Sequence, residues 1–359
     1  MLRFGKPAIR AAAMLILAAL LSGCWDTKDI NHRVLPVVMG LSKVDGNYNM
    51  FLQIPEPTSD DSKMRIVSDS GETVSDIVDK ISMNLESQID LLHLKVLLID
   101  RKYAEEGIND SITSFIRAQD ISPKTMVVIC DEPLDRFFDA MSKPDNQEST
   151  TLVHFFEKNA GWNPQVAQTR IWQMFRSIHS YTNDTMVPII RSDDSTVIQS
   201  RGSAIIRNGR MVDRITPDDT LMINIFNGHS AQGKIEVMDH ANVEIVSNAI
   251  SHKSRVAGNQ TFLECHVRLK VTILETKGEP SVAQVKWELE DLLRKRSEAL
   301  LAKLQKRKAD IVAFGQHFRT KIPRDQLAKW RTDYFPYTDI NLQFQVIVQN
   351  EGNLKMRKH

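Results

Sequence analysis

The longest helix-spaced stretch of the chain lies between residues 281 and 310. There the apolar side chains recur every three or four positions: Val282, Val285, Leu289, Leu292, Leu293, Leu300 and Leu304. This spacing predicts one helix of about eight turns with a single apolar stripe. A stripe of that length has to be buried against a second layer, so it limits the chain to folds that supply one.

The segment near the C-terminus has strand spacing instead. From Ile340 to Val348, apolar residues alternate with Asn and Gln, so one face of the strand is apolar and the other is polar. A polar face is expected of an antiparallel sheet that is covered on one side only. Three further strand-like segments precede the long helix, at 234–238, 242–250 and 261–274. We therefore predict a C-terminal α+β domain over 204–359, with the long helix at about 281–310 on its sheet.

A hairpin is predicted close to the start of the globular part. Residues 34–42 and 47–54 are apolar runs, and Asp45 and Gly46 between them are typical of a tight turn. The segment 58–71 that follows is rich in Ser and Asp, which favours a loop.

Strand and helix spacing then alternate. Residues 73–88 have helical spacing, and the buried-strand candidates 94–99 and 125–129 flank a predicted helix at about 101–118. Strand, helix and strand in this order predict an α/β layer, and we assign residues 24–130 to an N-terminal α/β domain.

The middle of the chain contains mostly helical and loop signals. We predict a helix-rich domain or subdomain over 131–203, because turn and charged residues gather at 191–203. A second hairpin signal, Asn208-Gly209, follows this boundary. The pattern as a whole predicts a mixed α/β (α+β) fold of two to three domains.

The first 23 residues have the pattern of a bacterial lipoprotein signal peptide. Three basic residues precede an apolar run, Ala11 to Leu21, that would span about 17 Å as a helix and is too short for a bilayer core of about 30 Å. The sequence Leu21-Ser22-Gly23-Cys24 then resembles a lipobox. We predict that residues 1–23 are removed and that Cys24 is lipidated and anchors the protein to the cell membrane.

The charge of the chain limits its partners. Of 359 residues, 46 are Lys or Arg and 45 are Asp or Glu, and removal of residues 1–23 would leave 43 basic and 45 acidic side chains, a net charge of −2. A nucleic-acid partner is not expected, since phosphates require a basic excess. Electrostatic attraction to anionic lipid is also not expected, so two or more acyl chains would have to hold the protein at the membrane.

The sequence contains no motif for catalysis, a cofactor or a metal. Its cysteines, Cys24, Cys130 and Cys265, are too few and too scattered for a zinc site or a disulfide framework. A near match to a phosphate-binding loop at 228–235 ends in Ile235, which cannot coordinate magnesium. We predict no catalytic, cofactor-binding or metal site, and no enzyme activity.

Four separated stretches resemble the Ger(x)C family of spore germination lipoproteins. The first two are Cys24-Trp25-Asp26 with Asp29-Ile30-Asn31, and the block from Leu91-Leu92-His93 through Tyr103–Ile108 to Phe115-Ile116-Arg117. The third is Gly202-Ser203-Ala204 followed by Arg210-Met211-Val212. The last is Asp310-Ile311, Phe314-Gly315, Pro323, Trp330 and Phe335-Pro336, continuing to Gly352. The chain departs from the family pattern at 32–36 and at Ala313.

The resemblance implies an elongated arrangement of mixed α/β domains without catalytic residues. It implies a non-catalytic C subunit of a nutrient germinant receptor, lipid-anchored on the outer face of the spore inner membrane beside A-type and B-type integral membrane subunits. Its role would be receptor assembly and germination signalling, and direct contact with the nutrient stays open. The alternatives are a solute-binding lipoprotein of a transport system, which needs two similar lobes, and a lipoprotein hydrolase, which needs a base near a nucleophile.

Overall fold

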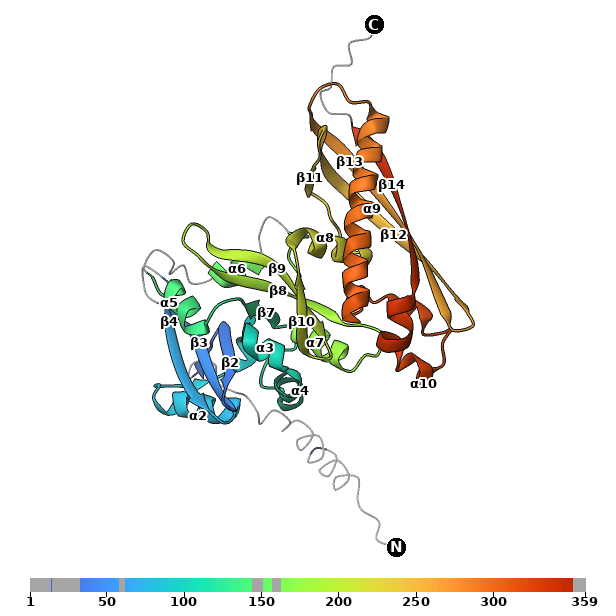
Figure 1. The fold of residues 1–359 in the computed structure, drawn as a ribbon. Helices are drawn as coiled ribbons and strands as arrows, with labels where there is room; N and C mark the ends of the chain where they lie inside the picture. Colours follow the sequence, from blue (N-terminus) through green and yellow to red (C-terminus); the bar gives the residue numbers. More distant parts are fainter. Residues whose placement is uncertain (1–13, 15–32, 58–61, 144–150, 157–162, 351–359) are drawn as a thin grey trace.

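Two β-sheets dominate the structure, a computed structural model that describes residues 14, 33–57, 62–143, 151–156 and 163–350. The larger sheet has eight strands in the order β10-β9-β8-β7-β6-β2-β3-β4, and the smaller has four in the order β11-β12-β13-β14. Figure 1 shows the larger sheet at the lower left and the smaller one along the right-hand side, beside a long helix. The mixed α/β fold class expected from the sequence is confirmed.

The eight-stranded sheet has a parallel centre and antiparallel edges. Strands β2, β6, β7 and β8 run parallel, while β3, β4, β9 and β10 are added by hairpins. The strands are β2 (Val38–Val44), β3 (Asn47–Pro57), β4 (Ser62–Gly71), β6 (Val96–Asp100), β7 (Met126–Cys130), β8 (Thr185–Asp193), β9 (Val197–Arg207) and β10 (Arg210–Ile215). A short parallel pair, β1 (Arg33–Val34) and β5 (Gln88–Ile89), lies outside this sheet.

Helices cover both faces of the eight-stranded sheet. Alternate residues of β6 show this, because Leu97 and Ile99 join one apolar cluster and Val96 and Leu98 join the other. The helices are α2 (Val74–Met83), α3 (Arg101–Glu106), α4 (Asn109–Ala118), α5 (Leu134–Met141), α6 (Thr151–Phe156) and α7 (Ile171–Ile178), with a short turn of helix η2 (Leu91–His93) before β6.

Two sequence expectations for this half are wrong. Most of the expected loop at 58–71 is strand β4, which pairs with β3 along its whole length. The segment looks like a loop because an edge strand can carry polar residues along its length. The single helix expected at 101–118 is broken into α3 and α4 at Gly107, whose φ of 124° ends the first helix.

The boundary expected near residue 203 falls inside β9. Strand β9 pairs with β8 on one side and with β10 on the other. The described part of residues 131–203 therefore supplies β8 and most of β9 to the eight-stranded sheet, besides the helices α5, α6 and α7. The turn between β9 and β10 is Asn208-Gly209, as expected, with φ values of 48° and 69°. The division of the chain into independently folding units stays a prediction.

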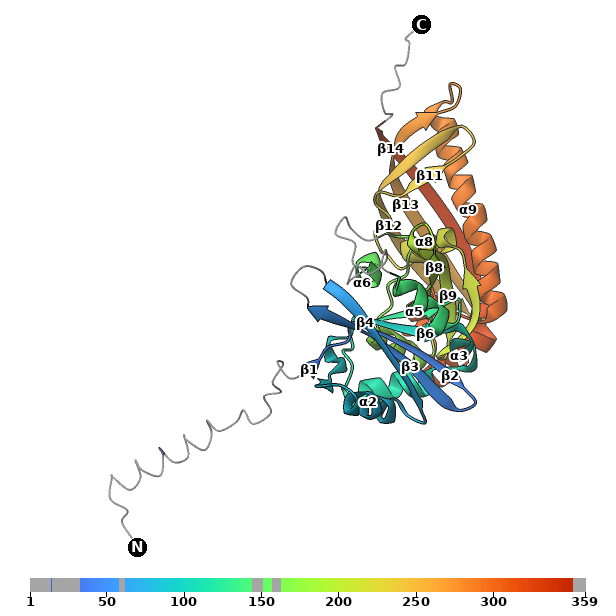
Figure 2. The same ribbon diagram turned by 90° about the vertical axis from the view of Figure 1, so that its left-hand side faces the viewer.

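The C-terminal part consists of the four-stranded sheet and helix α9 (Val282–Arg307). Before it come α8 (Pro217–Phe226), β11 (Ile235–Val237), β12 (Ala241–Ala257) and β13 (Gln260–Thr276), and the chain closes the sheet with β14 (Asp339–Asn350). Strand β14 pairs parallel to β13, which corrects the antiparallel expectation. The reason is the connection, because a helix that crosses over between two strands brings the second back in the same direction. Figure 2 shows α9 along one side of this sheet.

The expected stripe of α9 is largely buried. Val285, Leu289, Leu293 and Leu304 are fully buried, whereas Leu292 is only partly buried. Asp291 and Lys295, one turn apart on α9, form an ion pair at 2.6 Å. Four short helices link α9 to β14: η4 (Phe314–Phe318), α10 (Arg324–Leu327), η5 (Trp330–Tyr334) and η6 (Phe335–Tyr337).

Candidate functional site

The one site residue predicted from the sequence, the lipidated Cys24, lies outside the described residues, as do the signal peptide 1–23 and the motif residues around Asp29. Within the described ranges, no helix is both long enough and apolar enough to cross a membrane.

The described part of the chain also contains no group of three or more His, Cys, Asp or Glu side chains placed to hold a metal ion. Cys265 and His266 lie on adjacent positions of β13, and Cys265 is fully buried. Burial raises the pKa of Cys265 to about 12, so this thiol stays protonated and unreactive.

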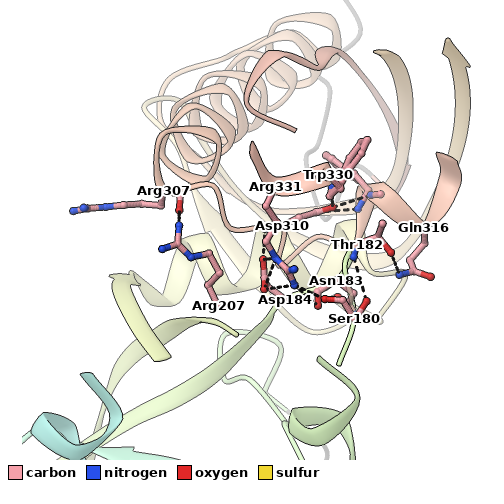
Figure 3. Close-up of polar contacts among 12 residues, drawn as sticks. Ser180, Thr182, Asn183, Asp184, Arg207, Arg307, Asp310, Gln316, Trp330 and Arg331 are labelled. Atoms are coloured by element: carbon pink, nitrogen blue, oxygen red, sulfur yellow. Dashed lines mark hydrogen bonds and ion pairs between the residues drawn. The ribbon is translucent and has the colours of Figure 1, made fainter. Parts of the chain in front are cut away.

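A buried polar junction joins the eight-stranded sheet to the C-terminal part (Figure 3). Asp184 stands directly before β8, and Asp310 follows α9. Two hydrogen bonds join the residues: Asp184 N–H donates to the Asp310 carbonyl at 2.9 Å, and Asp310 N–H donates to Asp184 Oδ2 at 2.9 Å. Asp184 is 1% exposed and Asp310 is fully buried.

Arg331 of η5 completes the pairing of Asp184. Its Nε donates to both carboxylate oxygens, at 3.1 and 3.0 Å, and its Nη2 donates to Oδ1 at 2.8 Å. The same Nη2 donates to the carbonyl of Ser180 at 2.6 Å. Burial raises the pKa of Asp184, and the hydrogen bonds and charge of Arg331 oppose that effect. Because the ion pair is bidentate, it fixes orientation as well as distance.

Asp310 is held by three donors from the short helices. The backbone N–H groups of Phe314 and Gly315 donate at 2.9 and 2.8 Å, and the indole Nε1 of Trp330 donates at 2.8 Å. Position 315 must be glycine, since a Cβ there would lie 2.7 Å from that indole nitrogen. Burial raises the pKa of Asp310 to about 7, although these hydrogen bonds favour the charged form. Asp310 therefore titrates near neutral pH inside the junction.

A cleft of about 810 Å³ opens beside this junction. Thr182 and Gln316 lie on its wall and are hydrogen-bonded to each other at 2.6 Å, and Arg176, Arg319 and Arg324 also line it. A second cleft, of about 620 Å³, lies between α2 and α4 in the N-terminal half. The junction itself can position the two sheets relative to each other, and its buried carboxyl can respond to pH.

Residues of the last of the four motif stretches meet at this junction. Asp310, Phe314, Gly315 and Trp330, noted in the sequence as one C-terminal block, are all in contact here. The sequence analysis missed Asp184 and Arg331. No local signal could have identified this pair, because the two residues are 147 positions apart and Asp184 is in none of the motif stretches.

The backbone geometry explains why a glycine begins the third motif stretch. Gly202 in β9 has a φ of 87°, and a Cβ there would lie 2.0 Å from the carbonyl oxygen of Ile215. Next to it, the buried hydroxyls of Ser203 and Thr220 are hydrogen-bonded at 2.9 Å, which fixes α8 against β9.

Comparisons with known families agree with these observations. Residues 26–192 match the model of the spore germination protein N-terminal domain, and residues 201–352 match the model described as spore germination B3/GerAC-like, C-terminal. The two matches are consecutive and span nearly the whole described chain. The chain belongs to the Ger(x)C family of spore germination proteins, as the sequence motifs predicted.

Two relatives are distant in sequence but align with nearly the whole chain. The chain is 21% identical to spore germination protein GerQC of Bacillus cereus, over 92% of this chain and 94% of that protein. It is 20% identical to spore germination protein KC of Bacillus subtilis, over 97% and 96% of the two chains. The crystal structure of the GerBC protein superposes with a TM-score of 0.58 at 15% identity, covering 87% of this chain and 97% of that one, so the fold is shared.

Proposed function

We propose that this chain is the non-catalytic C subunit of a nutrient germinant receptor and acts in receptor assembly and germination signalling. The observation that carries the proposal is the consecutive pair of family matches over 26–192 and 201–352. The buried junction supports it, because residues from both matched regions build one rigid connection: Asp184 from the first, Asp310 and Arg331 from the second. A subunit that passes a signal between partners needs parts whose relative position is fixed.

The partners under this proposal are the A-type and B-type integral membrane subunits of the receptor. The test is copurification from solubilised spore membranes with an affinity tag on this chain. Recovery of both membrane subunits supports the assignment, and recovery of neither under conditions that preserve a known receptor complex contradicts it. The solute-binding alternative gains no support from the fold, since an eight-stranded and a four-stranded sheet are not two similar lobes.

The proposal also places the protein on the outer face of the spore inner membrane, held by lipid on Cys24. Cys24→Ala should abolish incorporation of labelled palmitate and release the protein from the membrane fraction or leave an uncleaved precursor. Cys130→Ala and Cys265→Ala are matched controls, because both thiols are buried and should not affect labelling. Labelling that persists in Cys24→Ala contradicts the anchor. Loss of the label with normal germination contradicts its role in the receptor.

A further inference from the structure

Strand β14 forms an edge of the four-stranded sheet. Its amino-acid composition differs from that of the edge strands of the larger sheet. From Ile340 to Asn350 it contains no charged residue, no proline and no glycine. Exposed edge strands normally carry such residues, because an unmodified edge offers its backbone to any other strand. The two edges of the eight-stranded sheet do carry charges, with Arg65 and Asp69 on β4, and Arg210, Asp213 and Arg214 on β10.

The hydrogen-bond pattern shows which backbone groups of β14 face outward. Val346 N–H donates to the side chain of Glu290 at 2.8 Å and not to β13. In a parallel strand, alternate residues direct both backbone groups to the same neighbour. Ile340, Leu342, Phe344 and Val348 therefore share this outward direction with Val346. On this edge of the described structure, Glu290 occupies the position where a carbonyl of a further strand would lie. A paired strand would replace the Glu290 carboxylate with a backbone carbonyl as the acceptor of the Val346 N–H, and Glu290 would turn toward solvent.

The side chains on the inner face are also incompletely covered at this edge. On β13 the inward residues Leu263, Val267 and Leu269 are at most 1% exposed. Of the inward residues of β14, Val346 is 4% exposed, whereas Leu342 and Phe344 are only partly buried. An added strand would complete the burial of Leu342 and Phe344. The core is therefore closed around Val346 and left partly open beside it.

Helix α9 borders this edge with an apolar side chain and both signs of charge. Trp287 is 66% exposed, and a notch of about 170 Å³ lies between Phe344 and the α9 residues Trp287, Glu290, Asp291 and Arg294. An exposed tryptophan beside the open edge of a strand is typical of a surface that is covered by another chain.

We propose that β14 pairs antiparallel with β14 of a second copy of this chain, so that two four-stranded sheets become one continuous eight-stranded sheet. The segment suits a two-fold axis through Phe344. Phe344 would then pair with itself, Leu342 with Val346, and Gln343 with Gln345, so apolar residues meet apolar ones on the inner face and amides meet amides on the outer face. No like charges are opposed along the seam.

The flanking helices favour the same partner. Two-fold symmetry would place the two α9 helices antiparallel beside the seam, with Asp291 and Arg294 on each flank. Opposite charges of the two copies can then face each other, and the exposed Trp287 of each copy becomes buried. This inference does not rest on the receptor role, since it follows from the edge strand alone.

The test uses charge reversal at two exposed positions on the outer face of β14, in the full-length chain solubilised from membranes in dodecyl maltoside. Wild-type protein should have about twice the monomer mass by light scattering after gel filtration. Gln343→Glu/Gln345→Glu and Gln343→Lys/Gln345→Lys should each weaken self-association by roughly 2- to 30-fold, because each places two like-charged pairs across the seam. When the two variants are coexpressed with different tags, they should associate at least as well as wild type.

The matched control is Ala249→Glu/Ser251→Glu, which adds the same charges to the same face two strands away from the edge. It should leave the dimer intact. A monomeric wild type at all concentrations, or charged variants that dimerise as well as wild type, would overturn the proposal. Capture of one tagged copy by another only in the presence of a different membrane protein would also overturn it, since the seam would then belong to that partner.

Discussion

Arg331 and Asp184 form a bidentate ion pair although 147 residues separate them in the sequence. Asp184 stands at the start of β8 in the eight-stranded sheet, and Arg331 lies in η5 just ahead of β14 in the four-stranded sheet. Both side chains are buried, with 1% and 9% of the residue exposed. One desolvated pair of charges thus contributes to holding the two sheets together, and the stability of the junction can be tested there.

Arg331→Met should destabilise the protein by about 3–5 kcal/mol, because it leaves the Asp184 carboxylate buried without its partner. Urea unfolding of the purified chain measures this loss. The double variant Asp184→Asn/Arg331→Met should lose less than Arg331→Met alone, since it removes the orphaned charge. Arg255→Met is the control: Arg255 is exposed over the ring of Phe262, and its loss should cost at most about 1 kcal/mol. Equal losses for Arg331→Met and Arg255→Met would contradict the role of the pair.

Asp310 should lower the free energy of unfolding as the pH rises. Its folded pKa of about 7 lies above the usual aspartate value of about 3.9, so folding favours its protonated form. This contribution is complete below about pH 4 and is lost as the pH rises through 7, amounting to a few kcal/mol. The side chain of the Asp310→Asn variant cannot ionise, so this variant should not lose stability through position 310 as the pH rises.

The measurement for Asp310 is the free energy of unfolding at pH 4 and at pH 7.5, in wild type and Asp310→Asn. Other titrating groups, among them His252 with a pKa lowered to about 4 by burial, contribute to both proteins and cancel in the difference. The stability of wild type relative to Asp310→Asn should fall between the two pH values. A constant or rising difference would show that Asp310 is charged throughout.

The sequence predicts the elements of this fold better than their assembly. The α9 stripe, the hairpin turns at Asp45-Gly46 and Asn208-Gly209, and the alternation of β14 all follow from local spacing, and all are present. Strand β4 was missed because its polar residues give it no apolar alternation. The parallel direction of β14 was missed because it depends on the crossover through α9.

The junction was predictable only in part, for a related reason. The motif residues Asp310, Gly315 and Trp330 lie within 21 positions and could be recognised as one block. Their partner Asp184 is 126 positions away from Asp310, and nothing in its neighbourhood distinguishes it from a surface aspartate. The charged residues of β9 likewise look like a linker in the sequence, and only their pairing with β8 and β10 shows that they belong to the sheet.

Gly202→Ala should be far more damaging than Gly258→Ala, although both glycines have positive φ values, of 87° and 60°. A left-handed conformation costs a non-glycine residue about 1–2 kcal/mol at either position. Only at Gly202 would the new Cβ also collide with backbone, 2.0 Å from the carbonyl oxygen of Ile215, whereas nothing lies within 4 Å at Gly258. The melting temperatures of the two variants measure the difference. Similar values for both would mean that β9 and β10 can separate without cost.

Two adjacent leucines of α9 should respond differently to the same substitution. Leu293 is fully buried in the core of the C-terminal part, whereas Leu292 is only partly buried. Leu293→Asp would bury a carboxylate without a partner and should cost several kcal/mol, which approaches the total stability of many domains. Leu292→Asp can turn its carboxylate toward solvent and should cost clearly less.

Because Leu293→Asp could prevent folding altogether, Leu293→Ala provides a measurable version of the same test. It should cost about 2–5 kcal/mol in urea unfolding, since a buried leucine leaves a cavity when it is truncated. Leu292→Ala should remain below that range. Equal stability of the two alanine variants, or a lower stability of Leu292→Ala, would contradict this packing. It would mean that α9 is rotated on its sheet and that the stripe in contact with β13 and β14 is centred on Leu292.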